Sequence, residues 1–379
     1  MRTSTLSEEI VYFAGYKATA TSPVPVHRAK GFLWFPTVFR QADGDLVAVM
    51  QTYADIHTTV TGWMLATSSD DGNSWQSFSP NNHSAVSLHL PLPSGEALLL
   101  PYYFYPCPQG MQGAGYRLSP GNADPQPLDE KVVVTGWPRP LSIITPETGY
   151  AGFVCNRQWV RLKDGRYLTT YYGNFEGTSR YALVAGASAD GVRWEISSII
   201  ADETCKLTGE EGPCEAALCR LNDGRLMCIF RMGMAPKGTS YGQAWSSDEG
   251  KTWTTPISMP GIFSVEPSLA TLPDGTAVLS GGRPGLSCWI NRNGTGFGWD
   301  HIDLLTLHNR FHPDERIEYS EEFTGYQTTA YTTVIALDAQ TLLCIYDRIP
   351  LGWNGVPDDS PEINSVWALR LQIDDWQSL

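Results

Sequence analysis

The chain has little positive charge and no long apolar run. Among its 379 residues, 26 are Lys or Arg and 40 are Asp or Glu, which gives a net charge of −14. Such an acidic chain has no overall attraction for nucleic acid or for an anionic membrane, so we expect neither as a partner. No stretch has the length and hydrophobicity of a membrane span or a signal sequence. The sequence as it stands predicts a cytoplasmic protein; if a leader was removed, a secreted or periplasmic location is the alternative.

Closely spaced cysteine pairs are also lacking. The eight cysteines form no Cys-x-x-Cys pair, which argues against a zinc site, and we expect neither a metal nor a cofactor. Cys219, Cys228 and Cys344 lie inside apolar runs, where a reduced thiol packs as a small hydrophobic side chain. Charged residues make up only 17% of the chain, whereas 36 residues are Gly and 26 are Pro. This composition is typical of many short strands and turns.

What the sequence does contain is repetition. A pattern of apolar run, short polar turn and apolar run occurs six times, with turns at residues 43, 94, 164, 223, 274 and 338. Most of these turns carry Asp-Gly, which is a strong hairpin signal between apolar runs. A hairpin of this kind cannot bury its own apolar face, so repetition predicts sheets packed around an axis.

The repeat therefore predicts an all-β fold, a six-bladed β-propeller of four-stranded antiparallel blades. The intervals between the turns are long enough for four strands and their loops, and residues 1–379 are expected to form a single domain. We expect the segment Glu9 to Val26 to complete the last blade by pairing with Ser365 to Ile373. That pairing would leave no open sheet edge.

A second motif, Ser-x-Asp-x-Gly-x-Thr-Trp, occurs at residues 68–75 and 246–253, and with one residue deleted at 188–194. A degenerate (worn) copy lies at residues 291–299. Asp accepts backbone hydrogen bonds from following residues and Gly tolerates positive φ, so the motif predicts a tight turn. This motif is the Asp-box, and the chain resembles the sialidase superfamily of Asp-box (BNR-repeat) six-bladed β-propellers. The boxes stabilise turns and also occur in propellers without catalysis, so they indicate architecture more than chemistry.

Polar residues at the ends of the inner strands are the candidates for a site, because these strands line the central channel of a propeller. Glu215 precedes the inner strand of the fourth blade, and Arg231 follows sixteen residues later. Glu266 and Arg283 repeat the arrangement in the fifth blade, and Tyr331 takes the corresponding position in the sixth. Adjacent antiparallel strands are expected to return each Arg to the level of its Glu.

The resemblance to sialidases implies roles for these residues. It places a tyrosine nucleophile at Tyr331, its activating base at Glu215, and carboxylate-binding arginines at Arg231 and Arg283. A neutral phenol avoids the repulsion that a carboxylate nucleophile would suffer against a sugar acid. Arg suits the binding role because its guanidinium is permanently charged and binds carboxylates in a bidentate way.

The chain departs from the sialidase pattern in the first blade. Where the family has the first of its three carboxylate-binding arginines, this sequence has Trp34. An indole at a channel mouth suits stacking on a sugar face, so we expect that contact from Trp34. The family's acid catalyst falls on Asp55, with His57 as the rival. Arg157 in the third blade is expected to face the mouth and bind substrate.

These residues predict a sialidase-like exo-glycoside hydrolase that acts with retention on a terminal, anionic sugar of an oligosaccharide or polysaccharide. A variant for neutral sugars uses Glu215 with Glu266 or Glu176 as a carboxylate pair. The runner-up is a polysaccharide lyase, with a Tyr or His57 as base and Arg231 neutralising a uronate. A non-catalytic carbohydrate-binding propeller is the third alternative, and the altered first blade favours it. Carbohydrate is the expected partner in each case, and the oligomeric state stays open.

Overall fold

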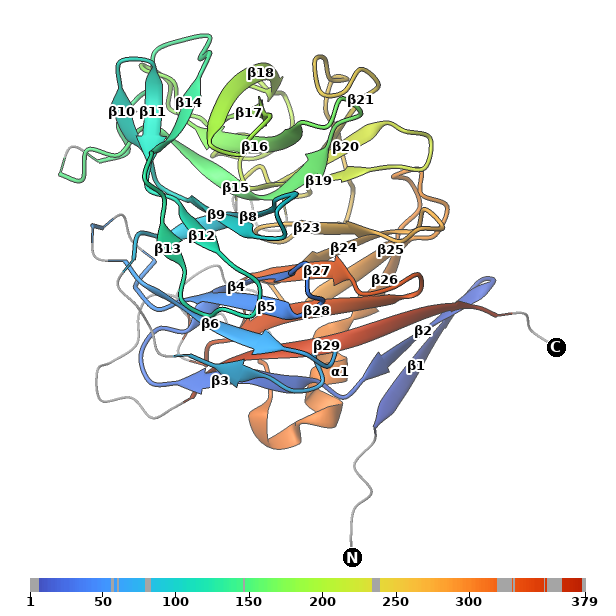
Figure 1. The fold of residues 1–379 in the computed structure, drawn as a ribbon. Coiled ribbons are helices and arrows are strands. Elements are labelled where there is room, and N and C mark those ends of the chain that lie inside the picture. Colours follow the sequence, from blue (N-terminus) through green and yellow to red (C-terminus); the bar gives the residue numbers. More distant parts are fainter. Residues whose placement is uncertain are drawn as a thin grey trace, which may run out of the picture.

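The structure is a computed structural model that describes residues 7–55, 58–59, 61–78, 83–145, 147–233, 239–318, 329, 331–350, 352 and 363–376. The described residues form six sheets that follow one another along the chain (Figure 1). Residues from the inner strands of all six sheets line one central cavity of about 270 Å³, so the sheets surround a common channel. This arrangement confirms the predicted propeller.

Four of the sheets have the four strands of a simple blade. Their strands are β4 (Trp34–Arg40), β5 (Leu46–Gln51), β6 (Trp63–Ser68) and β7 (Gln76–Ser77) in the first blade; β8 (Val86–Pro91), β9 (Ala97–Pro101), β12 (Tyr116–Leu118) and β13 (Gln126–Pro127) in the second; β19 (Ala216–Arg220), β20 (Leu226–Phe230), β21 (Gly242–Ser246) and β22 (Ile257–Ser258) in the fourth; and β23 (Ser268–Thr271), β24 (Ala277–Gly281), β25 (Ser287–Asn291) and β26 (Asp300–Asp303) in the fifth. In each blade the first strand faces the channel.

The third and sixth blades are enlarged. The third contains β15 (Phe153–Arg161), β16 (Tyr167–Gly173), β17 (Ala182–Ser188) and β18 (Arg193–Ala201), extended by β14 (Val132–Thr135), β11 (Gly110–Gly113) and β10 (Tyr105–Cys107). The sixth contains β27 (Thr332–Ala336), β28 (Thr341–Arg348) and β29 (Asn364–Asp375), joined by β1 (Glu8–Phe13), β2 (Tyr16–Thr21) and β3 (Val24–Ala29). Both β2 and β3 pair with β29, so strands from the two ends of the chain share one sheet (Figure 1).

The turns form where the sequence pattern places them. All six predicted hairpins join the first and second strands of a sheet. The Asp-boxes join the third and fourth strands: in the first of them, the Ser68 hydroxyl accepts from Gly72 N at 2.9 Å and Asp70 accepts from Ser74 N at 2.9 Å. In the worn copy, the Asn291 amide oxygen replaces the serine and accepts from Gly296 N at 2.8 Å.

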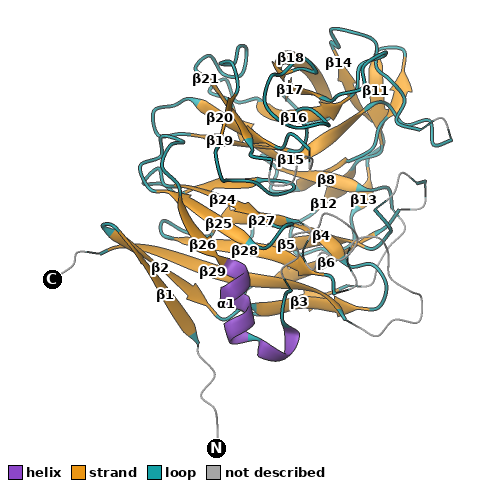
Figure 2. Cartoon of the chain, turned by 180° about the vertical axis from the view of Figure 1, so that it is seen from behind, coloured by secondary structure: helices purple, strands orange, loops and turns teal. Residues whose placement is uncertain are grey.

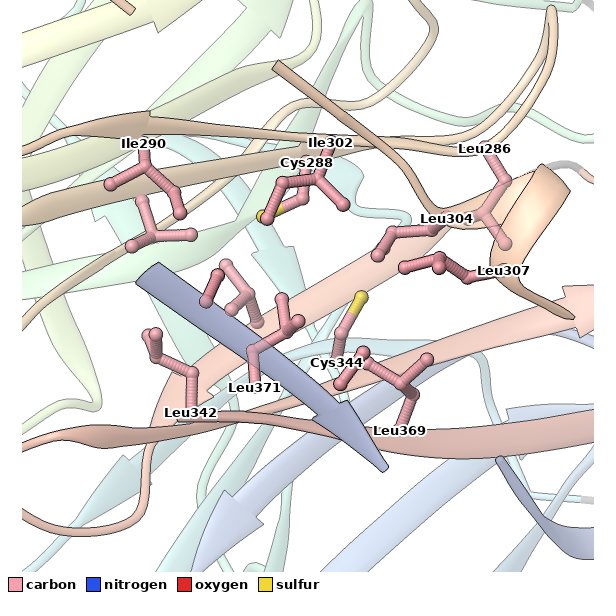
Figure 3. Close-up of a cluster of buried hydrophobic side chains, with 14 of the residues drawn as sticks. Leu286, Cys288, Ile290, Ile302, Leu304, Leu307, Leu342, Cys344, Leu369 and Leu371 are labelled. Carbon is pink, nitrogen blue, oxygen red and sulfur yellow. The ribbon is translucent and has the colours of Figure 1, made fainter. Parts of the chain in front are cut away.

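Apolar side chains fill the space between neighbouring blades. Figure 3 shows one such cluster, in which Cys288 and Ile290 of the fifth blade pack toward Cys344 and Leu369 of the sixth. The helix α1 (Leu304–Phe311) covers one edge of this cluster and is followed by a 3-10 helix, η1 (Pro313–Glu315) (Figure 2). All eight cysteines are free thiols. None of the helices in the described residues has the length and apolar character needed to cross a membrane.

Candidate active site

A carboxylate, a phenol and a guanidinium meet where the inner strands β19 and β27 begin. The Tyr331 hydroxyl donates to Glu215 Oε1 at 2.5 Å, and Arg231 Nη1 donates to Glu215 Oε2 at 2.6 Å. Ala216 pairs with Phe230 in the β19–β20 ladder, so the residues just outside this pair, Glu215 and Arg231, lie side by side. The structure therefore brings together three residues that the sequence places on two different blades.

Two residues in strained backbone conformations support this cluster. Among the described residues, four that are not glycine have positive φ, and two of those lie in Asp-box turns. The other two are Glu266, with φ of 23°, and Phe35, with φ of 50°. Glu266 N donates to Glu215 Oε2 at 2.9 Å, and the Phe35 ring lies 4.5 Å from the Tyr331 ring. Such conformations cost about 1–3 kcal/mol each, so the surrounding fold must hold them in place.

Arg157 lies behind the phenol, on the channel side. Its guanidinium carbon is 4.6 Å from the centre of the Tyr331 ring, and its Nη1 donates to Phe35 O at 3.1 Å. Its Nε is 3.7 Å from Glu266 Oε1, and both side chains are almost fully buried. The predicted substrate-binding residues Arg157 and Glu266 therefore belong to the cluster, where they contact Tyr331 and its supports.

The ionisation states follow from this packing. Burial opposes the charge on Glu215, but the Arg231 charge and the Tyr331 hydrogen bond outweigh it and lower the pKa of Glu215. Burial, reinforced by Glu215, raises the pKa of Tyr331 well above its ordinary value. Burial also raises the pKa of Glu266 to about 8, against the lowering effect of Arg157. At neutral pH the cluster thus holds an ionised Glu215, a neutral Tyr331 and a protonated Glu266.

Asp55 and Arg283 lie near the same cluster, since the charges of Glu215 and Arg231 act on the pKa values of both. Loss of hydration raises the pKa of Asp55, and the charge of Arg283 partly offsets the rise. Asp55 is itself exposed, so solvent limits this shift relative to those of the buried groups. Arg283 is buried, and burial lowers the pKa of its guanidinium. The rival acid, His57, lies outside the described residues.

Trp34 does not take the predicted position at the mouth. Its side chain is fully buried, its indole N–H donates to Tyr53 O at 2.9 Å, and its ring stacks on Phe35 at 4.8 Å. The strand register shifts between Trp34 and Thr37, which turns the indole into the protein. The structure therefore contradicts the expected stacking on a sugar, and Phe35 is the first-blade residue beside Tyr331.

Sequence reasoning missed two carboxylates that organise the site. Glu211 accepts from Arg231 Nη2 at 3.0 Å, so each terminal nitrogen of that guanidinium bonds to a carboxylate. Asp347 is buried and accepts from Phe35 N at 2.9 Å and from Tyr331 N at 3.4 Å. Asp347 follows Tyr331 by sixteen residues, the same spacing as in the fourth blade, and this spacing was the signal available in the sequence.

Two other tyrosines, Tyr102 and Tyr172, lie near the phenol of Tyr331. The hydroxyls of Tyr102 and Tyr172 lie 2.9 Å apart, and the ring of Tyr181 packs edge-on against Tyr172. Burial keeps Tyr102 and Tyr172 neutral by raising their pKa values well above the ordinary range. The described residues contain no group of three or more side chains suited to a metal ion. The phenols of Tyr102 and Tyr172 are therefore neutral neighbours of the charged arginines and carboxylates described above.

A wide surface groove lies away from this cluster. It has a volume of about 800 Å³ and runs between the fourth and fifth blades, past Trp289 and Phe297. Its volume alone would make it the first choice for a ligand site, but none of the clustered titratable residues lines it. The paired Glu215 and Tyr331 are the stronger guide, because chemistry needs convergent polar groups.

Comparison with known proteins agrees with this architecture. Residues 135–320 match the sequence model of the BNR repeat-like domain. A search of curated proteins found no match.

Solved structures share the fold of the whole chain. A protein of unknown function from Dyadobacter fermentans has a TM-score of 0.69 and 19% identity, over 96% of this chain and 100% of that one. The alpha-L-arabinanase of Penicillium chrysogenum, complexed with arabinobiose, has a TM-score of 0.58 and 14% identity, over 92% and 98%. Trypanosoma rangeli sialidase, in complex with the inhibitor DANA, has a TM-score of 0.57 and 15% identity, over 97% of this chain and 60% of that one. The predicted resemblance to the sialidase superfamily of BNR propellers is thus confirmed at the level of the fold.

Proposed function

We propose that the protein is a retaining exo-glycoside hydrolase with Tyr331 as its nucleophile. The observation that carries the proposal is the 2.5 Å hydrogen bond from the Tyr331 hydroxyl to an ionised Glu215. A carboxylate that accepts the phenol proton is positioned to remove it as the oxygen attacks. The fold, shared with an arabinanase and a sialidase, supports this class of reaction.

In the first step, the Tyr331 oxygen attacks the anomeric carbon while its proton passes to Glu215. Asp55 gives its proton to the glycosidic oxygen, the bond to the leaving group breaks, and a glycosyl–tyrosine intermediate forms. The raised pKa of Asp55 keeps its proton available closer to neutral pH. The lowered pKa of Glu215 keeps that carboxylate ready to accept one.

In the second step, water attacks the anomeric carbon, and Asp55 now removes the water proton. Tyr331 leaves as the sugar is released, and it recovers its proton from Glu215. Each group ends in its starting state, and two displacements at the same carbon retain its configuration.

The substrate we propose is a terminal sugar with an anionic group next to the reacting carbon. To this anionic group we assign Arg231, which bonds to Glu215, and Arg283, which lies near Tyr331 and Asp55. Arg231 already bonds to Glu215 and Glu211, so part of its hydrogen-bonding capacity is used within the protein. We therefore expect Arg231 to bind a sugar carboxylate less strongly than an arginine without such bonds would.

A second candidate replaces the phenol with a carboxylate pair. Glu215 and Glu266 lie beside each other, and their surroundings push their pKa values apart, one down and the other up to about 8. An ionised and a protonated carboxyl are the pair that a glycosidase acting on a neutral sugar needs. In that reaction Glu215 would attack and Glu266 would supply the proton.

Substitution of Tyr331 separates the two candidates. The assay compares 4-methylumbelliferyl N-acetylneuraminide with 4-nitrophenyl α-L-arabinofuranoside, for wild type, Tyr331→Phe, Glu266→Gln and the remote control Tyr12→Phe. Loss of the nucleophile is expected to lower kcat about a thousandfold or more in Tyr331→Phe, whereas Tyr12→Phe stays near wild type. Full activity of Tyr331→Phe together with an inactive Glu266→Gln would overturn the first candidate in favour of the second.

A further inference from the structure

The second blade contains an inserted hairpin, β10–β11, between its strands β9 and β12, and this hairpin pairs into the sheet of the third blade. Strands β10 and β11 pair with each other, and β14 joins them to the outer strand β18 of the third blade in parallel (Figure 1). This hairpin is one wall of a cavity of about 260 Å³, near the lower limit for a ligand site. Among the residues that line the cavity are Thr61, Tyr103, Tyr105, Gln112, Lys131 and Tyr150.

This cavity lies next to Asp55. Tyr103 is so close to Asp55 that the carboxylate adds to the effect of burial in raising the pKa of the phenol. The Tyr150 hydroxyl donates at 2.7 Å to the carbonyl of Thr58, in the same loop as Asp55. Two residues of the cavity lining, Tyr103 and Tyr150, are therefore close to Asp55 or to its loop.

The lining has the chemistry of a sugar site. The rings of Tyr103 and Tyr150 stack at 4.5 Å with an interplanar angle of 4°, and the Tyr105 ring lies 5.0 Å from Tyr150. Tyr105 is 44% exposed, so much of its surface is open to a ligand. Gln112 is the strand partner of Tyr105, and exposed Lys131 adds a cation at the rim. Flat aromatic rings with amide and ammonium donors beside them suit the apolar faces and hydroxyls of one sugar ring.

We propose that this cavity is a leaving-group subsite, which holds the sugar residue whose glycosidic oxygen Asp55 protonates. The inference rests on the proposed hydrolase function, because it takes its direction from the position of the acid. Asp55 protonates the oxygen that links the terminal sugar to the next one. The cavity near Asp55 is therefore our candidate for the place where that next sugar binds. The hairpin β10–β11 thereby acts as a specificity element for the second sugar of the chain.

The test compares two substrates that share the terminal sugar but differ in the leaving group. Sialyllactose is compared with 4-methylumbelliferyl N-acetylneuraminide, and arabinobiose with 4-nitrophenyl α-L-arabinofuranoside. For Tyr105→Ala and Gln112→Ala, kcat/KM for sialyllactose or arabinobiose is expected to fall about three- to tenfold. For the corresponding aryl glycoside, kcat/KM is expected to change less than about twofold. Tyr12→Ala, whose side chain is 55% exposed on β1, is the matched control and is expected to affect neither substrate.

Equal losses on both substrates, or no loss on either, would overturn the subsite while leaving the hydrolase proposal intact. If wild type cleaves none of the four substrates, the hydrolase proposal fails, and binding decides the subsite separately. Saturation-transfer NMR with lactose or arabinose on Tyr331→Phe supports the subsite if the added Tyr105→Ala change removes the signal and Tyr12→Ala keeps it. Absence of binding by the protein with Tyr105 intact would overturn it.

Discussion

The Asp-box turns at the rim and the charged cluster at the channel are built from similar side chains in different surroundings. At the rim, Asp248 accepts hydrogen bonds from Ser246 and Thr252, all within seven residues of chain. At the channel, Glu215 binds Tyr331 across 116 positions of sequence and is almost fully buried. The turns satisfy their carboxylates with hydrogen bonds from residues a few positions away, whereas the channel holds its carboxylates by contacts between blades.

The Asp-box turns contribute to stability, whereas the cluster at the channel has the properties of a reactive site. Burial opposes the charge on Asp248, but the hydrogen bonds that it accepts from Thr252 and Ser246 outweigh this effect and lower its pKa to about 2, so the group is ionised at neutral pH. The channel instead contains carboxyls with pKa values shifted in opposite directions, a pattern that is typical of functional sites. Substitutions in the channel cluster are therefore expected to have larger effects than substitutions in the Asp-box turns, and to change activity as well as stability.

The largest effect is expected from Arg231→Met, which leaves Glu215 and Glu211 without their cation. Removing one partner of a buried ion pair costs about 3–5 kcal/mol, because an uncompensated charge remains in the interior. We expect this loss in urea-induced unfolding, together with loss of turnover. A variant with wild-type stability would show that Arg231 contributes little to the cluster.

Trp34→Ala is expected to lower the free energy of unfolding by about 3–5 kcal/mol at every pH. The reason is that the indole is fully buried, stacks on Phe35 and donates to the carbonyl of Tyr53. The measurement is the free energy of unfolding followed by circular dichroism. A residue that stacks on sugar in solvent would instead lose ligand affinity and keep its stability, and that result would restore the original expectation for Trp34.

The pH dependence of stability is expected to change in Glu266→Gln. The folded-state pKa of about 8 lies above the unfolded value of about 4.3, so from pH 4.3 to 8 the folded protein keeps a proton that the unfolded chain releases. Glu266 therefore makes the wild type less stable as the pH rises through this window. Gln removes the penalty, and the variant is expected to gain of the order of 1–3 kcal/mol on wild type between pH 5 and 9. Parallel stability curves over that range would show that Glu266 titrates normally.

A smaller effect is expected from Asp248→Ala at the rim, which removes the acceptor of one Asp-box turn. Loss of such a local cap costs about 1 kcal/mol. Thermal unfolding measures the loss, and kcat/KM is expected to stay at the wild-type value. Reduced activity at matched stability would mean that the rim turns influence the site.

The smallest effect is expected from Arg117→Ala. Arg117 pairs with Glu96 at 3.0 Å, a distance similar to those of the Arg231 pairs, but the Arg117 side chain is 48% exposed. Exposed pairs contribute at most about 1 kcal/mol, so a change below about 0.5 kcal/mol is expected. A loss as large as that of Arg231→Met would remove the distinction between rim and channel.

The sequence predicted the parts of the molecule that depend on local chemistry. Short polar turns between apolar runs, four of them Asp-Gly, located all six hairpins, and the sixteen-residue spacing correctly brought Arg231 back beside Glu215. Trp34 was placed wrongly because a shift of register reverses the direction of a side chain, and the bulge that causes it has no turn signal in the sequence. The hairpin β10–β11 was also missed, because its pairing with β14, in the sheet of the third blade, is a contact between blades.

The most direct test of the account is to trap the sugar on its nucleophile. Wild type is treated with 2,3-difluorosialic acid, or with the 2-fluoro analogue of whichever sugar it releases, and the labelled peptide is located by mass spectrometry. The account predicts a covalent adduct on the Tyr331 oxygen, and no adduct in Tyr331→Phe. An adduct on Glu215 or Glu266, with Tyr331 unmodified, would contradict it.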